Sequence, residues 1–273
     1  MPQVTEDTML LAVNVGNTNI VFGLHDGEKW LRQWRVRTVR DKMPDEYGLL
    51  FREYLRETGV SLKDLEQAAI SSVVPPITDR MEEMLSAQMG VAPLIISATV
   101  KTGLRFAIDN PAELGADLIA DGVAAYDRVR GACIVVDFGT ATTFSAVAAD
   151  ATYLGVAIAP GINMAMSALA GGTAQLPQIR LSAPPKPIGT NTVHSIQSGI
   201  VLGYVGMVES LIARFREQMG VPAPVLATGG LVRLISPLTS CFAVVDEWLT
   251  LDGIRLIALR NKNSESANRR IGA

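Results

Sequence analysis

Apolar and polar positions along the chain alternate in short blocks that predict a succession of strands and helices. Residues 10–24 and 133–147 share one pattern, in which an apolar strand, a turn with a glycine and a second apolar strand follow one another. Further strands are expected at residues 30–38, 67–72, 94–96, 153–159 and 225–227, and helices at residues 45–57, 77–89, 114–129, 162–170 and 192–219. This succession is typical of an α/β fold.

The two hairpin-like stretches look like copies of one device, 123 positions apart. Asn14 and Gly16 in the first correspond to Asp137 and Gly139 in the second, and small hydroxyl or amide residues follow each glycine. Glycine lets the backbone approach a ligand closely, so such a turn can present N–H groups and hydroxyls to an anion. The alternative is two unrelated hairpins whose glycines only make turns, and the repetition disfavours it.

Two halves that each carry such a hairpin resemble the nucleotide-binding fold of actin, sugar kinases and Hsp70. The resemblance implies two duplicated actin-like domains, with mixed sheets flanked by helices, and ATP as a ligand. A chain of 273 residues with 48% hydrophobic content is long enough for two domains. We expect an N-terminal domain at residues 9–112, a C-terminal domain at residues 113–262 and a flexible tail at residues 263–273.

Charge and composition argue against several other classes of protein. The net charge of −3 and the lack of a dense basic run give no electrostatic footprint for nucleic acid. Arg32, Arg35, Arg37 and Arg40 alternate with apolar residues, which we interpret as one solvated face of a strand. The two cysteines and two histidines are far apart in the sequence. We therefore expect no disulfide framework, no metal cluster of Cys and His, and a reducing cytoplasm.

Membrane association is not expected either. The residues before the first strand lack the basic segment of a secretory signal. The stretch between Asp150 and Arg180 has no charge, but its glycines and Pro160 would break a spanning helix, so we predict a buried strand and a short buried helix there. In the long helix, three glycines (Gly199, Gly203 and Gly206) form a smooth stripe. We expect close packing on this stripe, within the chain or between two subunits.

A series of short motifs resembles, in order, the motifs of type III pantothenate kinases. They are NVGNTN at 14–19, SSVVP at 71–75, NPAELGAD at 110–117, DFGTATT at 137–143, APG at 159–161, GTAQLP at 172–177, NT at 191–192, QSG at 197–199, TGG at 228–230 and LTLDGIR at 249–255. The resemblance implies ATP-dependent phosphorylation of pantothenate, the first step of coenzyme A synthesis, by a cytoplasmic homodimer. It also implies Mg²⁺ with the ATP and a monovalent cation, K⁺ or NH₄⁺, beside the nucleotide.

The resemblance also implies roles for individual residues. Asp117 would be the general base for the substrate hydroxyl, Asp137 would bind the monovalent cation, and Thr140 would contact ATP. Thr192 would line the pantothenate pocket. The full nucleotide set is Asn14, Val15, Gly16, Asn17, Thr18, Asn19, Gly139 and Thr140, and the full substrate set is Ile108, Gly115, Ala116, Asp117, Leu118 and Thr192.

Several positions depart from the family's pattern. Asn14 and Ser145 stand where the family has aspartates, Leu118 replaces an arginine, Ile108 replaces the tyrosine of many members, and Thr190 replaces a lysine. Leucine cannot form the bidentate contacts of an arginine with an anion, and an amide lacks the charge of a carboxylate near a hard cation. We therefore expect weak or lost kinase activity. The alternative is a non-catalytic homologue that acts as a binding or regulatory protein.

Overall fold

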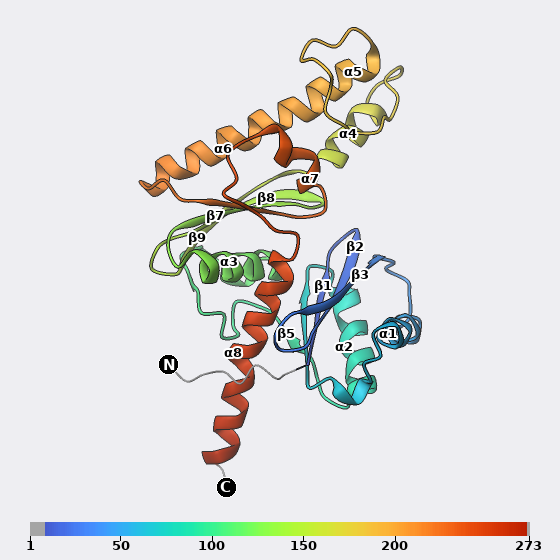
Figure 1. Ribbon diagram of the computed structural model, residues 1–273, viewed down its shortest axis with the longest axis vertical. Helices are drawn as coiled ribbons and strands as arrows, with labels where there is room; N and C mark the ends of the chain where they lie inside the picture. Colours follow the sequence, from blue (N-terminus) through green and yellow to red (C-terminus); the bar gives the residue numbers. More distant parts are fainter. Residues whose placement is uncertain (1–8, 272–273) are drawn as a thin grey trace. The chain divides into compact units, whose positions relative to one another are not determined.

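The structure is a computed structural model that describes residues 9–271, with only the backbone described for residues 263–271. The chain forms two compact units, neither of which is continuous in sequence. The first comprises Met1–Gly103, Asp109–Ala124 and Thr250–Ala273, and the second comprises Leu104–Ile108 and Ala125–Leu249. Each unit is built around its own sheet (Figure 1).

The sheet of the first unit has five strands in the order β3-β2-β1-β4-β5. Its strands are β1 (Leu10–Val15), β2 (Asn19–His25), β3 (Trp30–Arg37), β4 (Gln67–Ser72) and β5 (Leu94–Ile95). The β1–β2 and β2–β3 pairs are antiparallel, whereas β4 runs parallel to β1 and to β5. Helices α1 (Pro44–Thr58) and α2 (Pro75–Met89) lie side by side next to this sheet (Figure 1).

Each face of this sheet is buried by different helices. On one face, Val13, Phe22 and Ile70 form a core with residues of α1 and α2 such as Phe51 and Met81. This arrangement follows from the alternation of side chains along each strand, because every second residue of β1 and β2 on this face is apolar and Ala68 and Ile70 of β4 lie on the same face. On the opposite face lies α8 (Leu249–Ile271), which belongs to the first unit from Thr250 onward.

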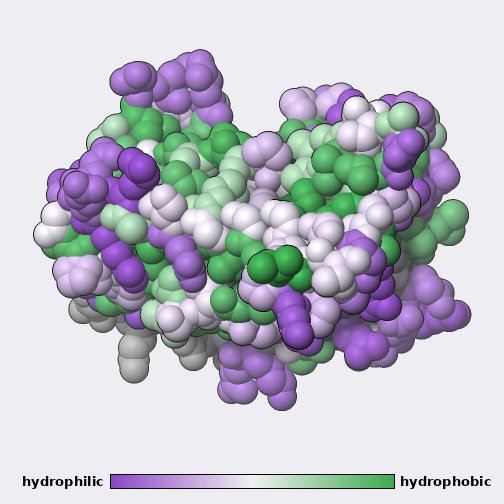
Figure 2. Space-filling view, turned by 90° about the horizontal axis from the view of Figure 1, so that it is seen from above, coloured by the Kyte–Doolittle hydropathy of each residue, from purple (hydrophilic) through white to green (hydrophobic). Residues whose placement is uncertain are grey.

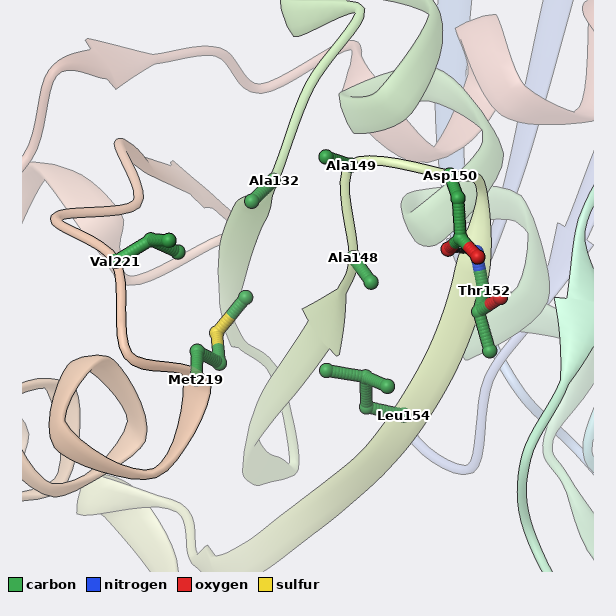
Figure 3. A pocket seen from close by; sticks show the side chains of 8 residues that line it. All are labelled: Ala132, Ala148, Ala149, Asp150, Thr152, Leu154, Met219 and Val221. Atoms are coloured by element: carbon green, nitrogen blue, oxygen red, sulfur yellow. Dashed lines mark hydrogen bonds between the residues drawn. The ribbon is translucent and has the colours of Figure 1, made fainter.

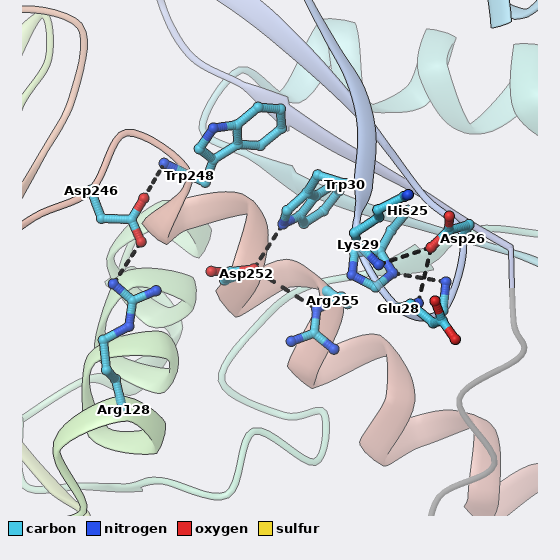
Figure 4. Close-up of polar contacts among 11 residues, drawn as sticks. His25, Asp26, Glu28, Lys29, Trp30, Arg128, Asp246, Trp248, Asp252 and Arg255 are labelled. Atoms are coloured by element: carbon cyan, nitrogen blue, oxygen red, sulfur yellow. Dashed lines mark hydrogen bonds and ion pairs between the residues drawn. The ribbon is translucent and has the colours of Figure 1, made fainter.

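Contacts between the β2–β3 hairpin and α8 fix the helix on that face (Figure 4). A side chain at Gly23 would come within 2.8 Å of Leu251 Cδ1, so the glycine admits the helix closely. The indole N–H of Trp30 donates a hydrogen bond of 2.8 Å to Asp252 Oδ1. His25 stacks edge-on against Trp30, and burial, with the charge of Arg255 nearby, lowers the pKa of His25 to about 4.

The sheet of the second unit has six strands in the order β11-β10-β7-β8-β9-β6. Its strands are β6 (Arg105–Phe106), β7 (Cys133–Phe138), β8 (Ala141–Val147), β9 (Thr152–Pro160), β10 (Val225–Thr228) and β11 (Val244–Val245). One core covers it, in which Val136, Phe138 and Phe144 pack against Val201 and Val208 of the long helical segment (Figure 1). The helices of this unit are α4 (Ile162–Gly171), α5 (Thr192–Gln197), η3 (Ser198–Leu202), α6 (Gly203–Met219), α7 (Val232–Ile235) and η4 (Ser236–Leu238).

The remaining elements are two short 3₁₀ turns, η1 (Leu62–Asp64) and η2 (Pro111–Glu113), and the helix α3 (Ala116–Val129), which begins in the first unit and ends in the second. The structure thus contains every strand and helix expected from the sequence. Both hairpins are confirmed, and each pairs its two strands through six opposed residues. The predicted division at residues 112 and 113 stays a prediction about folding domains. The predicted tail at residues 263–273 cannot be compared fully with the structure. Only the backbone is described for residues 263–271, and residues 272–273 lie outside the described part of the chain.

The segment predicted as a buried strand and a short buried helix forms both elements, β9 and α4, but it is only partly buried, so the prediction of burial was wrong. Ile158 of β9 is 67% exposed and Leu154 is 41% exposed, and only Ile162 and Met166 of α4 are buried. The prediction failed because small uncharged residues tolerate solvent, so the absence of charge did not imply burial. Figure 2 shows that hydrophobic residues reach the surface between hydrophilic ones on one face of the molecule.

The predicted single solvated face of arginines is also wrong. β3 is an edge strand in which Trp34 and Val36 face the core, and Arg32 shares their side of the strand. Arg35 and Arg37 point to the opposite side. All three arginines are exposed, but they lie on two different faces of the sheet.

The long helix predicted at residues 192–219 is continuous but contains one π-helical turn, η3. By length and composition it is the one helix among the described residues that could cross a membrane. That is weak evidence, because Val201, Val208 and Ile212 on it pack into the core of the second unit. A Cβ at Gly199, Gly203 or Gly206 would meet no atom within 4 Å. The described part of the chain therefore does not supply the close packing expected for the glycine stripe.

Candidate active site

The first hairpin turn lies at the surface and is fixed by hydrogen bonds within itself and from Thr38, the residue after β3. The N–H of Gly16 donates to the carbonyl of Asn19 at 2.9 Å, which closes the turn. Thr38 donates twice, from Oγ1 to the carbonyl of Gly16 at 2.6 Å and from its N–H to that of Thr18 at 2.9 Å. Asn17, Thr18 and Asn19 are exposed at this turn. The backbone of the turn is thus fixed, while the turn itself lies at the surface, where a ligand can reach it.

Asn14 lies half-buried on the strand that leads into this turn. It is paired in register with Val21 on β2 and with Ser71 on β4. The hydroxyl of Ser71 is fully buried and has no hydrogen-bond partner among the residues that the structure describes. The second unit repeats this pattern, because Thr228 on β10 pairs with Asp137 and its buried hydroxyl also has no partner. The duplication seen in the sequence therefore extends to the neighbouring parallel strand.

Asp117 lies in the first turn of α3, close to the same end of the first sheet. A Cβ at Gly115 would lie 2.6 Å from Asp117 Oδ1 and 3.3 Å from a methyl of Val73. Val73 follows β4, and its N–H donates to the carbonyl of Val15 at 3.1 Å. The structure therefore brings Asp117 and Gly115 to the edge of the sheet that carries the first hairpin turn.

The environment of Asp117 favours its neutral form more than water does. Burial raises the pKa of this carboxyl, and the N–H of Leu118, which donates to Oδ1 at 2.8 Å, opposes the rise. A carboxyl with a raised pKa is a better proton acceptor in its ionised form. Leu118 itself is 7% exposed, so its apolar side chain lies in the protein interior. Ile108 is half-buried in the second unit.

The second hairpin turn is framed by two glycines from other segments. The N–H of Gly161 donates to the carbonyl of Thr140 at 3.1 Å, and a Cβ on Gly161 would lie 2.1 Å from that oxygen. Gly229 has a φ of +94°, and a Cβ on it would lie 2.2 Å from Asp137 Oδ1. Asp137 and Gly139 are half-buried, and Thr140 is exposed. Only glycine fits at both framing positions.

Beneath this turn, buried hydroxyls tie the strands together. Tyr204 of α6 donates to Thr142 Oγ1 and lies 3.2 Å from the carbonyl of Pro160. Burial raises the pKa of Tyr204, and so does the charge of Asp137 nearby. Ser145 is buried and accepts a hydrogen bond of 2.7 Å from Tyr153. At this position, where the resemblance implies an aspartate, the hydroxyl therefore forms a hydrogen bond within the buried part of the sheet.

Thr192 is the first residue of α5 and is exposed, as is Thr190. The side chain of Asn191 caps this helix by accepting from the N–H of His194 at 2.9 Å. Gly189 is packed against Ser195, where a Cβ would lie 2.4 Å from its nitrogen. The loop before α5 is thus tightly fitted to the helix, and it presents Thr192 to solvent.

Within each unit, the structure brings together part of the expected site. The first unit gathers the residues of the first turn with Gly115, Ala116 and Asp117, and the second gathers Asp137, Gly139 and Thr140. Sequence reasoning missed Thr38, which carries no motif. Gly161 and Gly229 were visible only as parts of glycine motifs. Among residues 9–262, whose side chains are described, no group of three His, Cys, Asp or Glu could hold a metal ion by itself.

A separate cavity of about 430 Å³ lies at the other end of the second sheet (Figure 3). It is lined by Ala132, Ala148, Ala149, Asp150, Thr152, Leu154, Met219 and Val221. Ala132 precedes β7 and Ala148 follows β8, so the cavity lies away from the Gly139 turn. None of the expected site residues lines it.

Comparison with known structures identifies the fold. A Baf family transcriptional activator from Campylobacter jejuni superposes with a TM-score of 0.57 at 17% identity, over 93% of this chain and 99% of that one. The inorganic polyphosphate/ATP-glucomannokinase from Arthrobacter sp. strain KM gives a TM-score of 0.50 at 13% identity, over 94% and 99% of the two chains. At these identities the likeness shows the fold alone, and it confirms the predicted α/β actin-like fold of the sugar kinases.

Sequence comparison identifies the family. The family model described as type III pantothenate kinase matches residues 10–214. The type III pantothenate kinase of Moorella thermoacetica is 48% identical over 93% of this chain and 100% of its own length. That of Myxococcus xanthus is 46% identical over 94% and 100%. With matches of this extent and identity, the chain belongs to the type III pantothenate kinase family.

Proposed function

We propose that this chain transfers the γ-phosphoryl group of ATP to the hydroxyl of pantothenate, and that it does so slowly. The observation that carries the proposal is the position of Asp117. Its carboxyl is half-buried, has a raised pKa and lies at the sheet edge that carries the first hairpin turn. Family membership and near-complete coverage of the kinases from Moorella and Myxococcus give independent support.

In the proposed reaction, Asp117 accepts the proton of the substrate hydroxyl as the hydroxyl oxygen attacks the γ-phosphorus. The bond from that phosphorus to the β–γ bridging oxygen breaks, and ADP leaves with the electron pair. Phosphoryl transfer depends mainly on positioning and charge stabilisation, which suits turns that offer N–H groups and hydroxyls. We assign the turn at Asn14–Asn19, with Gly139 and Thr140, to binding the nucleotide, and Thr192 with Gly115 and Ala116 to binding pantothenate.

The residues around Asp137 fit a monovalent cation. Asp137 pairs in register with Thr228, whose buried hydroxyl has no hydrogen-bond partner among the described residues, and a side chain at Gly229 would clash with Asp137 Oδ1. Asn14 fits Mg²⁺ less well than an aspartate would, because its amide oxygen carries no net charge. Bound with ATP, Mg²⁺ would supply charge neutralisation for the transferred group.

Slow turnover follows from the replacements in the pattern. Pantothenate is a carboxylate, and Leu118 cannot donate the hydrogen bonds of an arginine fork. A hydrogen bond to a charged group contributes about 1.5–3 kcal/mol, which corresponds to roughly 10- to 150-fold in catalytic efficiency. Asn14 adds a further loss through weaker organisation of Mg²⁺. Ile108, Ser145 and Thr190 remove other polar groups of the family's pattern.

We also propose a cytoplasmic homodimer, supported by the exposed glycine stripe on η3 and α6.

A second candidate function is a non-catalytic homologue that binds a ligand or regulates a partner. The burial of Leu118, at 7% exposure, favours it, because the side chain is used for packing.

The test is phosphorylation of pantothenate by the purified protein at high ATP with Mg²⁺ and K⁺. Asp117→Asn is expected to abolish turnover, and Asp79→Asn, an exposed carboxylate on α2 of the same unit, is the matched control that retains it. Absence of turnover in the folded wild-type protein would favour the second candidate. Turnover that survives in Asp117→Asn would contradict the role assigned to that carboxylate.

A further inference from the structure

Strand register places two arginines on the face of the first sheet that carries Asn14. Asn14 pairs with Val21, and Val21 pairs with Arg35, so the three side chains form one row across β1, β2 and β3. Neighbouring strands are about 5 Å apart, which puts the Cα atoms of Asn14 and Arg35 about 10 Å from each other. In the next row, Asn19 lies in the middle. It accepts a hydrogen bond from the N–H of Gly16 on one side and pairs with Arg37 on the other. Both arginines are therefore neighbours of the turn.

This end of the face is open. Gly23, two residues along β2 from Val21, is covered by Leu251 and Trp30. Val21 is only half-buried, and Arg35 and Arg37 are exposed. The helix that buries the rest of the face therefore does not cover the part beside the turn.

The two guanidinium groups are available to a ligand. Between residues 9 and 262, the guanidinium group of neither Arg35 nor Arg37 has an ion-pair or hydrogen-bond partner. Asn14, in the same row as Arg35, contributes no negative charge to compete for them. Thr38, directly after Arg37, donates to the carbonyls of Gly16 and Thr18, so the end of β3 moves with the turn. The backbone that carries the arginines is thus fixed to the turn, so their side chains extend from positions next to it.

We propose that Arg35 and Arg37 are polyphosphate-binding residues that extend the anion site of the first hairpin turn along the edge strand β3. This inference rests on the proposed function, since the expected ligand is the polyphosphate chain of a nucleotide. Guanidinium forks bind phosphate oxygens through pairs of hydrogen bonds, and their charge offsets that of the phosphates. Asn14 would hold Mg²⁺ less well than a carboxylate. The two arginines would make up part of the positive charge that the phosphates then lack.

The experiment measures binding of inorganic tripolyphosphate, ATP and adenosine by isothermal titration calorimetry at low salt. Arg35→Gln and Arg37→Gln are each expected to weaken tripolyphosphate and ATP binding about tenfold, and the double variant about a hundredfold. Adenosine binding should not change. Arg32→Gln is the matched control, because Arg32 is exposed on the same strand but faces the other side of the sheet; its affinities should stay within about twofold of the wild type.

The outcomes separate this inference from the proposed kinase activity. Tripolyphosphate affinity that is unchanged in the double variant, or that falls equally in Arg32→Gln, overturns the inference even if pantothenate is phosphorylated. A wild-type protein that binds no tripolyphosphate also overturns it. If the arginine pattern holds for tripolyphosphate while no pantothenate is phosphorylated, the inference stands and the proposed function fails. Both residues are exposed, so the variants should fold, which the melting temperature checks.

Discussion

Replacing Gly161 by alanine tests whether close backbone approach positions the second hairpin turn. Gly161 has φ −64° and ψ 154°, a conformation open to every residue, so the substitution adds no backbone strain. The new Cβ would lie 2.1 Å from the carbonyl oxygen of Thr140 and 2.8 Å from that of Gly139. Ordinary contact begins at 3.4 Å, so the two segments must separate by about 1.3 Å. This separation breaks the hydrogen bond from the Gly161 N–H to Thr140, now 3.1 Å long.

The cost can be worked out from these two effects. Overpacking of a well-packed site costs about 1–3 kcal/mol, and loss of the hydrogen bond adds about 0.5–1.5 kcal/mol. We expect the free energy of unfolding to fall by about 2–4 kcal/mol, and for a chain of this length the melting temperature to fall by about 4–7 °C. Because Thr140 moves, ATP affinity should also fall, by about tenfold.

Urea unfolding and calorimetric ATP binding measure both effects. Gly171→Ala is the matched control, because it lies in α4 near the same segment and its Cβ would meet no atom within 4 Å. That variant should be neutral or up to about 1 kcal/mol more stable. If Gly161→Ala unfolds at the same urea concentration as the control and binds ATP as well, the turn does not depend on this close approach and the reasoning is refuted.

Three further predictions concern the replaced and buried residues. Asn14→Asp combined with Leu118→Arg should raise the kcat/KM for pantothenate at least tenfold, and unchanged kinetics would show that these replacements are not what limits turnover. Ser145→Ala should lower the free energy of unfolding by about 0.5–1.5 kcal/mol because it removes the hydrogen bond that Tyr153 donates to Ser145. Tyr153→Phe removes the same bond, so the double variant should lose less than the sum of the two single variants in denaturant unfolding, and strictly additive losses would argue against the bond. Folding lowers the pKa of His25 from 6.5 to about 4, so the unfolded chain binds the proton more readily and the free energy of unfolding should fall as the pH drops from about 6.5 to about 4. Urea unfolding at a series of pH values should show a smaller fall in His25→Gln. An equal fall in that variant would assign the pH dependence to other groups.

Much of the fold could be predicted because its elements are locally encoded. The two hairpins have apolar strands on both sides of a glycine turn, and β4 was predicted to the residue. The helix α8 was not predicted, because its second half is polar and its first half was noted only as a motif. Its buried residues Leu251, Ile254, Ile257 and Ala258 do recur at helical spacing, which is the signal that could have found it.

The site was less predictable, since its geometry depends on pairing between distant segments. Alternation along β3 separates Arg32 from Arg35 and Arg37, but only the register across three strands shows that Arg35 lies in the row of Asn14 and Arg37 next to the turn. The buried hydroxyls of Ser71 and Thr228 became comparable only once each was paired with its hairpin residue. Gly161 and Gly229 carried a motif, but the atoms that exclude a side chain there come from another part of the chain.

The discontinuity of the first unit has a consequence for how the chain folds as it is synthesised. The ribosome releases β1 to β5 early, but the helix that covers Gly23 and bonds to Trp30 is made only after every segment of the second unit. Until then one face of the first sheet stays uncovered, while the second unit between Ala125 and Leu249 already has all of its strands and helices. The nascent protein therefore finishes its later unit first, and a stalled or shortened product lacking α8 would expose the apolar side of its opening strands to chaperones and proteases.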